Sequence, residues 1–418
     1  MTDLSNLFGG YDDGDPDGVA PGADLQQIDL PDGVYFDLDP TTYFGLDALG
    51  SSDVMSLARR RHGWWWKSRH NPLLQQATTD AQNYGSALHS ILLEGPEAYR
   101  RDFLVSPDKA DFPGLLVSTD DITSALKAAG VNLQGTSKFK KADWVQAALS
   151  ELPDRPVWDA IIEAFDHAAR RPDGTTRPSV TKTEDAMLKI MFDMATDLND
   201  PDAVEIARLL ISDDHPPMAE VSVIYTDPRG LRRRCRFDRL FPKVTLDLKS
   251  LRGIWNGRPL EAAIDDVIKK HGYDVQRADY HEGRKYLYAF IRMGMQHVHG
   301  GTEEQRAWLA TWPDRYPRWD WVWLFYQKPD MTEGHAPVVF PLWDDHASDY
   351  HRAGLRKKER ALDFYQLQVD RVGLDKPWGR VSPLHYTDDK LSPSILRYPD
   401  GAEDAQQPLE NEDRLLGL

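Results

Sequence analysis

The alternation of apolar and polar side chains between residues 218 and 250 predicts three neighbouring β-strands. Runs rich in β-forming residues cover 218–226, 231–241 and 244–250. A turn containing proline and glycine separates the first two at 227–230, and Pro242 breaks the chain before the third. Because side chains alternate along a strand, we expect each strand to present one buried and one polar face.

Three chemically active side chains share the expected polar faces. Asp238 lies near the end of the second strand, and Asp247 and Lys249 share one face of the third. Converging carboxylates repel each other unless a cation lies between them, and Mg²⁺ takes such oxygen ligands. A divalent ion eases deprotonation of water and stabilises phosphoryl charge, and a nearby lysine can orient the attacking water. The pattern therefore fits a metal-dependent nuclease, although an exposed strand with a surface ion pair has the same spacing.

Periodic apolar positions bounded by capping residues, glycine or proline predict helices in the rest of the chain. The expected helices cover 51–66, 84–94, 119–129, 141–152, 201–211, 259–271, 273–293 and 346–369, and a capping box at Thr181 and Glu184 opens another. Two further strands are expected at 321–327 and 337–342. Residues 108–178 are interpreted as a helical insertion. Its two helices and the basic turn at 138–141 are either a small DNA-binding module or an ordinary helix pair.

Arginines fill positions 59–61 and tryptophans fill 64–66. Either the tryptophans pack in the core while the arginines face solvent, or the run contacts phosphates and stacks on an unpaired base. Three adjacent tryptophans cannot share one helix face, so at least one is expected to do more than fill the core. His89 lies among leucines and by itself indicates an ordinary core histidine. Glu220 is either a surface carboxylate or a further acid near the metal.

Length and composition set outer limits on the architecture. A chain of 418 residues allows two or three domains, or one large domain with insertions. The single cysteine, Cys235, excludes a disulfide framework and a four-cysteine metal site within one chain, and it fits a cytoplasmic protein. No apolar run approaches the length of a membrane span, and the N-terminus is acidic, unlike a signal peptide.

The net charge of −17 is concentrated at the two ends of the chain. Residues 1–40 hold ten acids and no Lys or Arg, and residues 381–418 carry a net charge of −5, which leaves about −2 for the middle. A near-neutral body can still carry a basic groove, because affinity for phosphates depends on local Lys and Arg placement. The N-terminal segment is expected to be disordered, either as a solubilising tail or as a DNA mimic that shields the groove.

Five spaced motifs occur in one order along the chain. They are Tyr84-Gly85-Ser86-Ala87-Leu88-His89 followed by Leu93-Glu94, Glu220-Val221-Ser222, Arg236-Phe237-Asp238, Asp247-Leu248-Lys249, and Gln276-x3-Tyr280. In this order they resemble the RecE-like (exodeoxyribonuclease VIII-like) phage exonucleases of the PD-(D/E)xK nuclease superfamily. The resemblance covers roughly residues 40–380 and is more specific than Asp-x-Lys alone, because all five motifs must agree.

The resemblance implies a role for each matching position. His89, Asp238 and Asp247 would ligate the metal. Lys249 would be the catalytic lysine and Glu220 an accessory catalytic acid. The residues expected to contact DNA are Gln276 and Tyr280, from the resemblance, and Arg59, Arg60 and Arg236, from their positive charge.

The implied fold is α/β, a PD-(D/E)xK nuclease core with a central mixed β-sheet flanked by helices. The expected division is an acidic disordered segment at 1–40, an exonuclease domain at 41–380 with the insertion at 108–178, and an acidic tail at 381–418. Mg²⁺ is the expected cofactor, with Mn²⁺ able to substitute.

The implied activity is 5′→3′ hydrolysis of linear double-stranded DNA, which produces 3′ single strands for recombination. Linear duplex ends, a single-strand annealing protein and further copies in a homo-oligomeric ring are the expected partners. Two alternatives stay open on sequence grounds. One is a non-catalytic DNA-binding or scaffolding protein on the same fold, and the other is an endonuclease or single-strand nuclease of the same superfamily.

Overall fold

The computed structural model describes residues 29–73, 80–172, 174–201, 203–211, 216–251, 259–312, 319–327, 338–345 and 347–379. Most of the acidic N-terminal segment and the whole C-terminal tail expected at 381–418 lie outside these residues. The first described strand is β1 (Gly33–Tyr35), so regular structure begins before residue 41.

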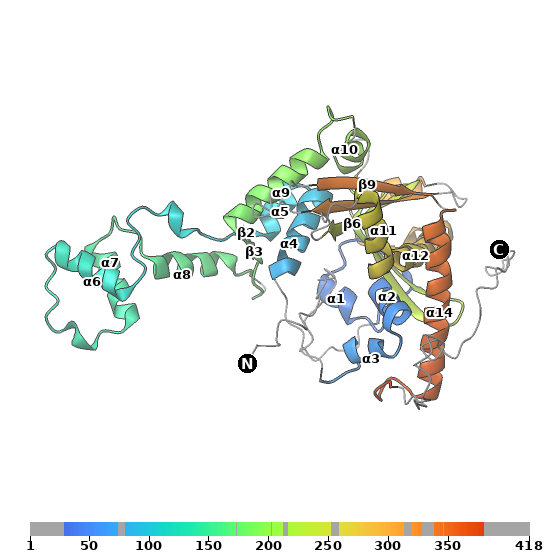
Figure 1. The fold of residues 1–418 in the computed structure, drawn as a ribbon, viewed down its shortest axis with the longest axis horizontal. Coiled ribbons are helices and arrows are strands. Elements are labelled where there is room, and N and C mark those ends of the chain that lie inside the picture. The colour runs from blue at the N-terminus through green and yellow to red at the C-terminus, as the bar shows by residue number, and fades with distance from the viewer. Residues whose placement is uncertain are drawn as a thin grey trace, which may run out of the picture.

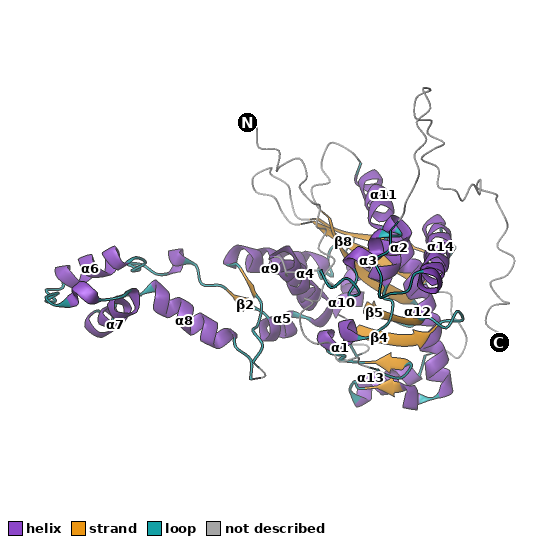
Figure 2. Ribbon diagram, turned by 90° about the horizontal axis from the view of Figure 1, so that it is seen from below, coloured by secondary structure: helices purple, strands orange, loops and turns teal. Residues whose placement is uncertain are grey.

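A seven-stranded mixed sheet forms the centre of the fold, in the order β7-β1-β4-β5-β6-β8-β9 (Figure 1; Figure 2). Its other strands are β4 (Ala219–Thr226), β5 (Arg232–Leu240), β6 (Val244–Leu251), β7 (Val298–His299), β8 (Asp320–Gln327) and β9 (Val338–Asp344). β4, β5 and β6 pair antiparallel in sequence, whereas β6 pairs in parallel with β8. The expected strands are thus confirmed, and the chain has a mixed α/β fold.

Every helix that the sequence predicts occurs among the described residues, whereas the helices at 40–45, 96–102, 158–169 and 303–310 were not predicted. The described helices are α1 (Pro40–Gly45), α2 (Ser51–Arg60), α3 (Gly63–Lys67), α4 (Asp80–His89), α5 (Pro96–Asp102), α6 (Thr119–Ala128), α7 (Lys141–Glu151), α8 (Trp158–Ala169), α9 (Lys182–Ala195), α10 (Val204–Ile211), α11 (Leu260–His271), α12 (Tyr273–Met293), α13 (Glu303–Ala310) and α14 (Asp349–Arg371). The capping box that opens α9 is confirmed. Among the described residues, no helix combines the length and apolarity needed to cross a membrane.

Helices cover both faces of the sheet (Figure 1). On one face, Cys235 and Phe237 of β5 belong to an apolar cluster that includes residues of α12. On the other face, Leu246 and Leu248 of β6 pack with residues of α4 and α9. The strand faces that were expected to be polar are therefore also covered, and most of their side chains are buried or partly buried. Even Arg234 is buried. Its guanidinium donates to backbone carbonyls between residues 43 and 46, which compensates for the loss of hydrogen bonds to water.

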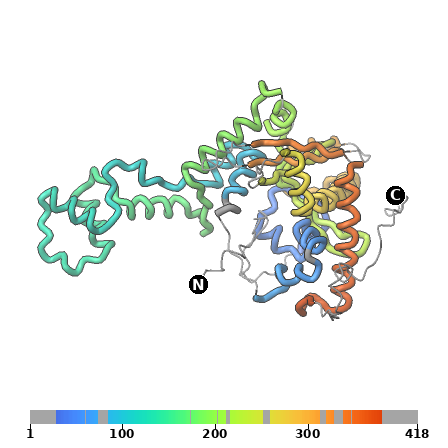
Figure 3. The backbone as a smooth tube through the Cα atoms, viewed as in Figure 1, coloured from blue at the N-terminus to red at the C-terminus, as the bar shows by residue number. Residues whose placement is uncertain are grey.

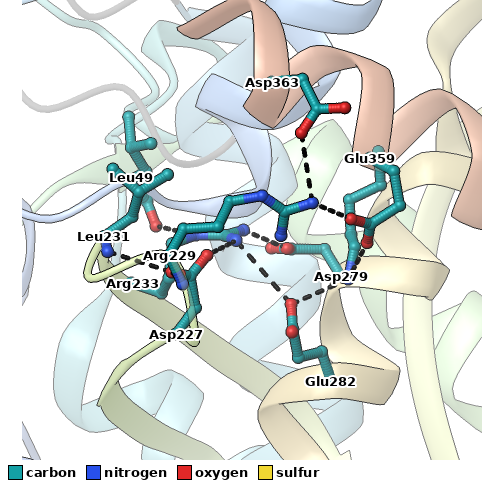
Figure 4. A network of polar contacts seen from close by, with 10 residues as sticks. Leu49, Asp227, Arg229, Leu231, Arg233, Asp279, Glu282, Glu359 and Asp363 are labelled. Atoms are coloured by element: carbon teal, nitrogen blue, oxygen red, sulfur yellow. Dashed lines mark hydrogen bonds and ion pairs between the residues drawn. The ribbon is translucent and has the colours of Figure 1, made fainter. Parts of the chain in front are cut away.

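A buried ionic network fastens the β4–β5 hairpin to α12 and α14 (Figure 4). The fully buried guanidinium of Arg233 bonds to Asp279 of α12 and lies 3.6 Å from Asp227 and 3.8 Å from Glu282. Lys358 of α14 donates to Glu282 at 2.8 Å. Burial alone would lower the pKa of Arg233, but the surrounding carboxylates outweigh it and raise that pKa, so the arginine stays charged.

The tryptophans at 64–66 hold the chain that follows α14. The helix expected at 51–66 is broken at Arg61, which has a φ of 41°, into α2 and α3. Trp65 and Trp66 donate their indole N–H groups to the carbonyls of Leu374 and Trp378. Trp66 alone keeps a large exposed fraction, 47%. The indoles of Trp65 and Trp66 thus satisfy backbone carbonyls of the segment after α14, whereas the buried Trp64 donates its indole N–H to the carboxylate of Asp53.

The insertion forms an arm that leaves the body between β2 (Leu104–Val105) and β3 (Ser179–Val180), which pair in parallel. Figure 3 shows α6 and α7 at its far end, with α8 leading back toward the sheet. Ile122, Leu126 and Ala148 belong to a small apolar core of its own. The two expected helices are confirmed, and α8 is an addition that the sequence interpretation missed.

Candidate functional site

The candidate site lies where β5 and β6 separate. Within the described chain the two strands pair only at Arg239–Leu246 and Leu240–Thr245. Beyond these pairs, the backbone N–H of Leu248 donates to a side chain of the neighbouring strand. Its acceptor is Oδ2 of Asp238, at 2.7 Å. The opening between the strands therefore has a carboxylate at its edge.

The backbone at Glu220 changes which side chains face which side of the sheet. Val221 and Phe237 pair across the ladder and face the α12 side. The next pair in the ladder is Ala219 with Arg239, and both face the opposite side of the sheet. Ala219 packs there with the apolar cluster of α4 and α9, and Arg239 donates to the carbonyl of Leu93. Glu220 lies between Ala219 and Val221 with a φ of 53°, a conformation that is uncommon outside glycine. Such breaks in alternation re-aim side chains, and here they bring Glu220 toward Asp238.

His89 approaches the same point from α4. It is the last residue of that helix, which continues as a π-helical turn at Ser90–Glu94. Its Nδ1 lies 4.0 Å from Oδ2 of Asp238. One donor atom each from His89, Glu220 and Asp238 lie within 4.8 Å of one another. We call these three residues the His/Glu/Asp cluster. A π-turn and a non-glycine residue with positive φ thus meet at one site, as is frequent at functional centres.

The donor set of the cluster fits a divalent cation. Two carboxylates and one imidazole are all partly buried, so water screens their charges less than at an open surface. Arg236 offsets part of this charge, with its Nη1 3.7 Å from the carboxylate of Glu220. Carboxylate oxygens suit Mg²⁺ and Mn²⁺, and the imidazole adds a donor that transition metals accept.

Asp247 and Lys249 form a buried ion pair beside the cluster. Lys249 Nζ lies 2.9 Å from Oδ2 of Asp247 and 5.1 Å from the ring centre of Tyr273 in α12. Burial alone would lower the pKa of Lys249, but Asp247 and then Asp238 outweigh it and raise that pKa. The ammonium group is therefore charged, and it interacts electrostatically with the carboxylates of Asp247 and Asp238, both predicted metal ligands.

The tight three-residue group differs from the ligand set expected from sequence. His89 and Asp238 are brought together as expected, and Glu220, expected as an accessory acid, completes the group. Asp247 is not a member of it, and its carboxylate contacts Lys249. The structure thus places all five residues in one region, with Asp247 and Lys249 on the side that faces α12.

Tyr326 of β8 belongs to this region and was missed by the sequence interpretation. Its hydroxyl is hydrogen-bonded to the side chain of Ser250, and Lys249 and Asp238 both act on it electrostatically. Burial raises the pKa of Tyr326 to about 12. Tyr326 reaches the site because β6 and β8 pair in parallel, in a register that places it opposite Ser250. That pairing of distant strands cannot be read from local sequence.

Three of the residues expected to contact DNA are buried or partly buried. Gln276 and Tyr280 share the buried face of α12, and Tyr280 packs edge-on against Phe237, with ring centres 5.2 Å apart. Arg236 donates to the side chain of Ser222 and to the carbonyl of Leu38, and its guanidinium lies 4.1 Å from the ring centre of Tyr43.

The two arginines of α2, Arg59 and Arg60, were also expected to contact DNA. Arg59 donates to the carbonyl of His271. The side chain of Arg60 lies outside the described residues.

A scan against protein-family models finds no match, and a search of curated proteins likewise finds none.

Proposed function

We propose that this chain is a metal-dependent DNA exonuclease on a PD-(D/E)xK nuclease core. It would hydrolyse linear double-stranded DNA, 5′→3′, and leave 3′ single strands for recombination. The observation that carries the proposal is the His/Glu/Asp cluster beside the Asp247–Lys249 pair at the opening between β5 and β6. The order of motifs along the sequence supports the same assignment, and the polarity rests on the family resemblance.

Each residue of the site has a task in this proposal. His89, Glu220 and Asp238 would hold Mg²⁺, and Mn²⁺ is expected to substitute. When bound, the ion supplies charge stabilisation to a phosphate oxygen and eases the deprotonation of water. Lys249 stays protonated beside Asp247 and offers a positive charge to the scissile phosphate. Asp247 holds the lysine in place and is the next carboxylate available to a metal.

The proposed partners follow from the activity and from the resemblance. Linear duplex ends are the substrate, a single-strand annealing protein would take the product strand, and further copies of the chain would form a ring around the duplex. The body of the chain outside its acidic ends is close to neutral, so local basic groups can bind phosphates.

Digestion of linear duplex DNA labelled at the 5′ or the 3′ end tests the proposal. The protein is incubated with Mg²⁺ or with EDTA, beside a closed circular duplex. We expect early loss of the 5′ label with Mg²⁺ only, and an intact circle. A linear duplex that survives undegraded beside a working control nuclease would refute the exonuclease. Cleavage of the circle would instead indicate an endonuclease of the same superfamily.

One observation favours a second candidate, a non-catalytic DNA-binding or scaffolding protein. Asp247, the central acid of the sequence motif, contacts Lys249 and lies outside the His/Glu/Asp cluster. This candidate predicts DNA retention without turnover, and function that is indifferent to Asp247→Ala. The exonuclease instead predicts that Asp247→Ala abolishes cleavage while the fold is kept.

A further inference from the structure

The arm at residues 106–178 is not explained by the proposed catalytic site. Its tip has an apolar core formed by α6, α7 and the segments beside them, including Leu126 and Val145. The tip therefore does not depend on the sheet to bury its apolar side chains. Figure 1 and Figure 2 both show it projecting away from the body. A feature this far from the sheet stabilises the site little, so a role in binding is the simpler explanation.

Positive charge gathers at the far end of this arm, around the loop between α6 and α7. Residues 122–150 contain four lysines and a single acid, Asp143. That acid caps the start of α7, where its carboxylate accepts the backbone N–H of Lys140 at 2.7 Å. We call the exposed side chains of Lys127, Lys138 and Lys140 the tip lysines.

The tip lysines differ from several exposed lysines of the body. Among the residues that the structure describes, none of the three has a carboxylate within ion-pair distance. By contrast, Lys189 and Lys269 each pair with an aspartate one helical turn away, at 2.7 Å. Positive charges without intramolecular partners attract anions, because no neighbouring carboxylate cancels their field.

The root of the arm lies beside the helix that carries His89. Val180 of β3 shares an apolar cluster with Leu88, the residue before His89. The arm therefore starts on the side of the sheet from which His89 enters the site. Its supporting helix α8 has 12 residues and is about 18 Å long at 1.5 Å per residue. That length corresponds to about five base pairs of duplex at ~3.4 Å each.

We propose that the tip lysines bind the phosphate backbone of duplex DNA, away from the end that occupies the His/Glu/Asp cluster. The contact is independent of base sequence, because lysines act on phosphates as point charges. It positions the duplex and adds affinity without touching the reacting bond. The identity of the ligand as DNA rests on the proposed function, whereas the location of the contact rests on the arm alone.

Salt-dependent binding of a labelled duplex in EDTA tests the proposal, because no cleavage intervenes. The triple variant Lys127→Gln, Lys138→Gln, Lys140→Gln is compared with a control that neutralises Lys189, Lys243 and Lys269. Each phosphate contact contributes about 0.9 to the slope of log affinity against log salt. We expect the tip variant to lower that slope by roughly 2 to 3 and to weaken binding at low salt. The control should retain the wild-type slope, since it removes the same charge from the body.

The outcome separates this inference from the proposed function. Equal slopes for the tip variant and the control overturn the arm contact, even if the wild-type protein digests DNA with Mg²⁺. A reduced slope for the tip variant alone supports the arm contact, even if no cleavage occurs. Because the three substituted side chains are exposed, a matched circular dichroism spectrum is expected for both variants.

Discussion

Replacing Arg233 by methionine tests whether burial governs the strength of the network between the β4–β5 hairpin and α12. The guanidinium has no exposed surface and faces three carboxylates: Asp279, in direct contact, Asp227 and Glu282. Methionine fills part of the volume but leaves these acids in a region from which water is excluded. A buried charge that loses its partner is strongly destabilising, because its desolvation is no longer compensated.

We expect Arg233→Met to lower the free energy of unfolding by about 3–5 kcal/mol. That is a large part of the roughly 5–15 kcal/mol by which domains are usually stable. The matched control is Arg229→Met, four residues earlier. Arg229 also pairs with two carboxylates, Glu359 and Asp363, but its side chain is 28% exposed and its partners are more exposed still. Such surface pairs contribute about 0–1 kcal/mol.

Urea denaturation followed by circular dichroism measures both variants. The reasoning is refuted if Arg233→Met and Arg229→Met shift the midpoint by the same small amount. A second refutation would be a double variant, Arg233→Met with Asp279→Leu, that is no more stable than Arg233→Met alone. Removal of the stranded carboxylate should recover part of the loss, because the two side chains contact each other.

The Arg233→Met variant should also respond to pH. Burial raises the pKa of Asp279 even though Arg233 acts to lower it. When the cation is removed, the pKa of Asp279 should therefore rise further. The folded variant then binds a proton at a pH where the unfolded chain has released it. The contribution of this group to stability is therefore fully present below its unfolded pKa of about 3.9 and is lost as pH rises through the folded pKa. The deficit against wild type should be smaller at about pH 5 than at about pH 8.

Three further predictions concern the site and the core. Lys249→Ala should keep Mg²⁺ binding by calorimetry and lower the cleavage rate by about 10²–10⁴-fold, and an unchanged rate would remove the lysine from the mechanism. His89→Ala should raise the Mg²⁺ concentration needed for half-maximal cleavage, whereas an unchanged metal dependence would return His89 to a packing role. Gly283→Ala should cost about 1–3 kcal/mol in a urea melt, because its new methyl would overlap the sulfur of Cys235. A double variant with Cys235→Ala should recover stability, and failure to do so would place the clash elsewhere.

The sequence determined most of the local structure, for identifiable reasons. Alternation and turn residues located β4, β5 and β6, because both signals depend on neighbours within a few positions. The capping box at Thr181 and the glycine at 272 similarly fixed helix ends. The residues of the candidate site were also all named from sequence, apart from Tyr326.

Only the tertiary structure decided how those residues meet. Strict alternation placed Asp238 on the polar face of β5, but no local pattern indicated the positive φ at Glu220 on the neighbouring strand β4. The tight group consequently contains Glu220 in place of Asp247. His89 reaches Asp238 because α4 packs on Leu246 and Leu248, residues far away in the chain. Such contacts depend on many weak interactions between distant segments, which no local pattern of residues encodes.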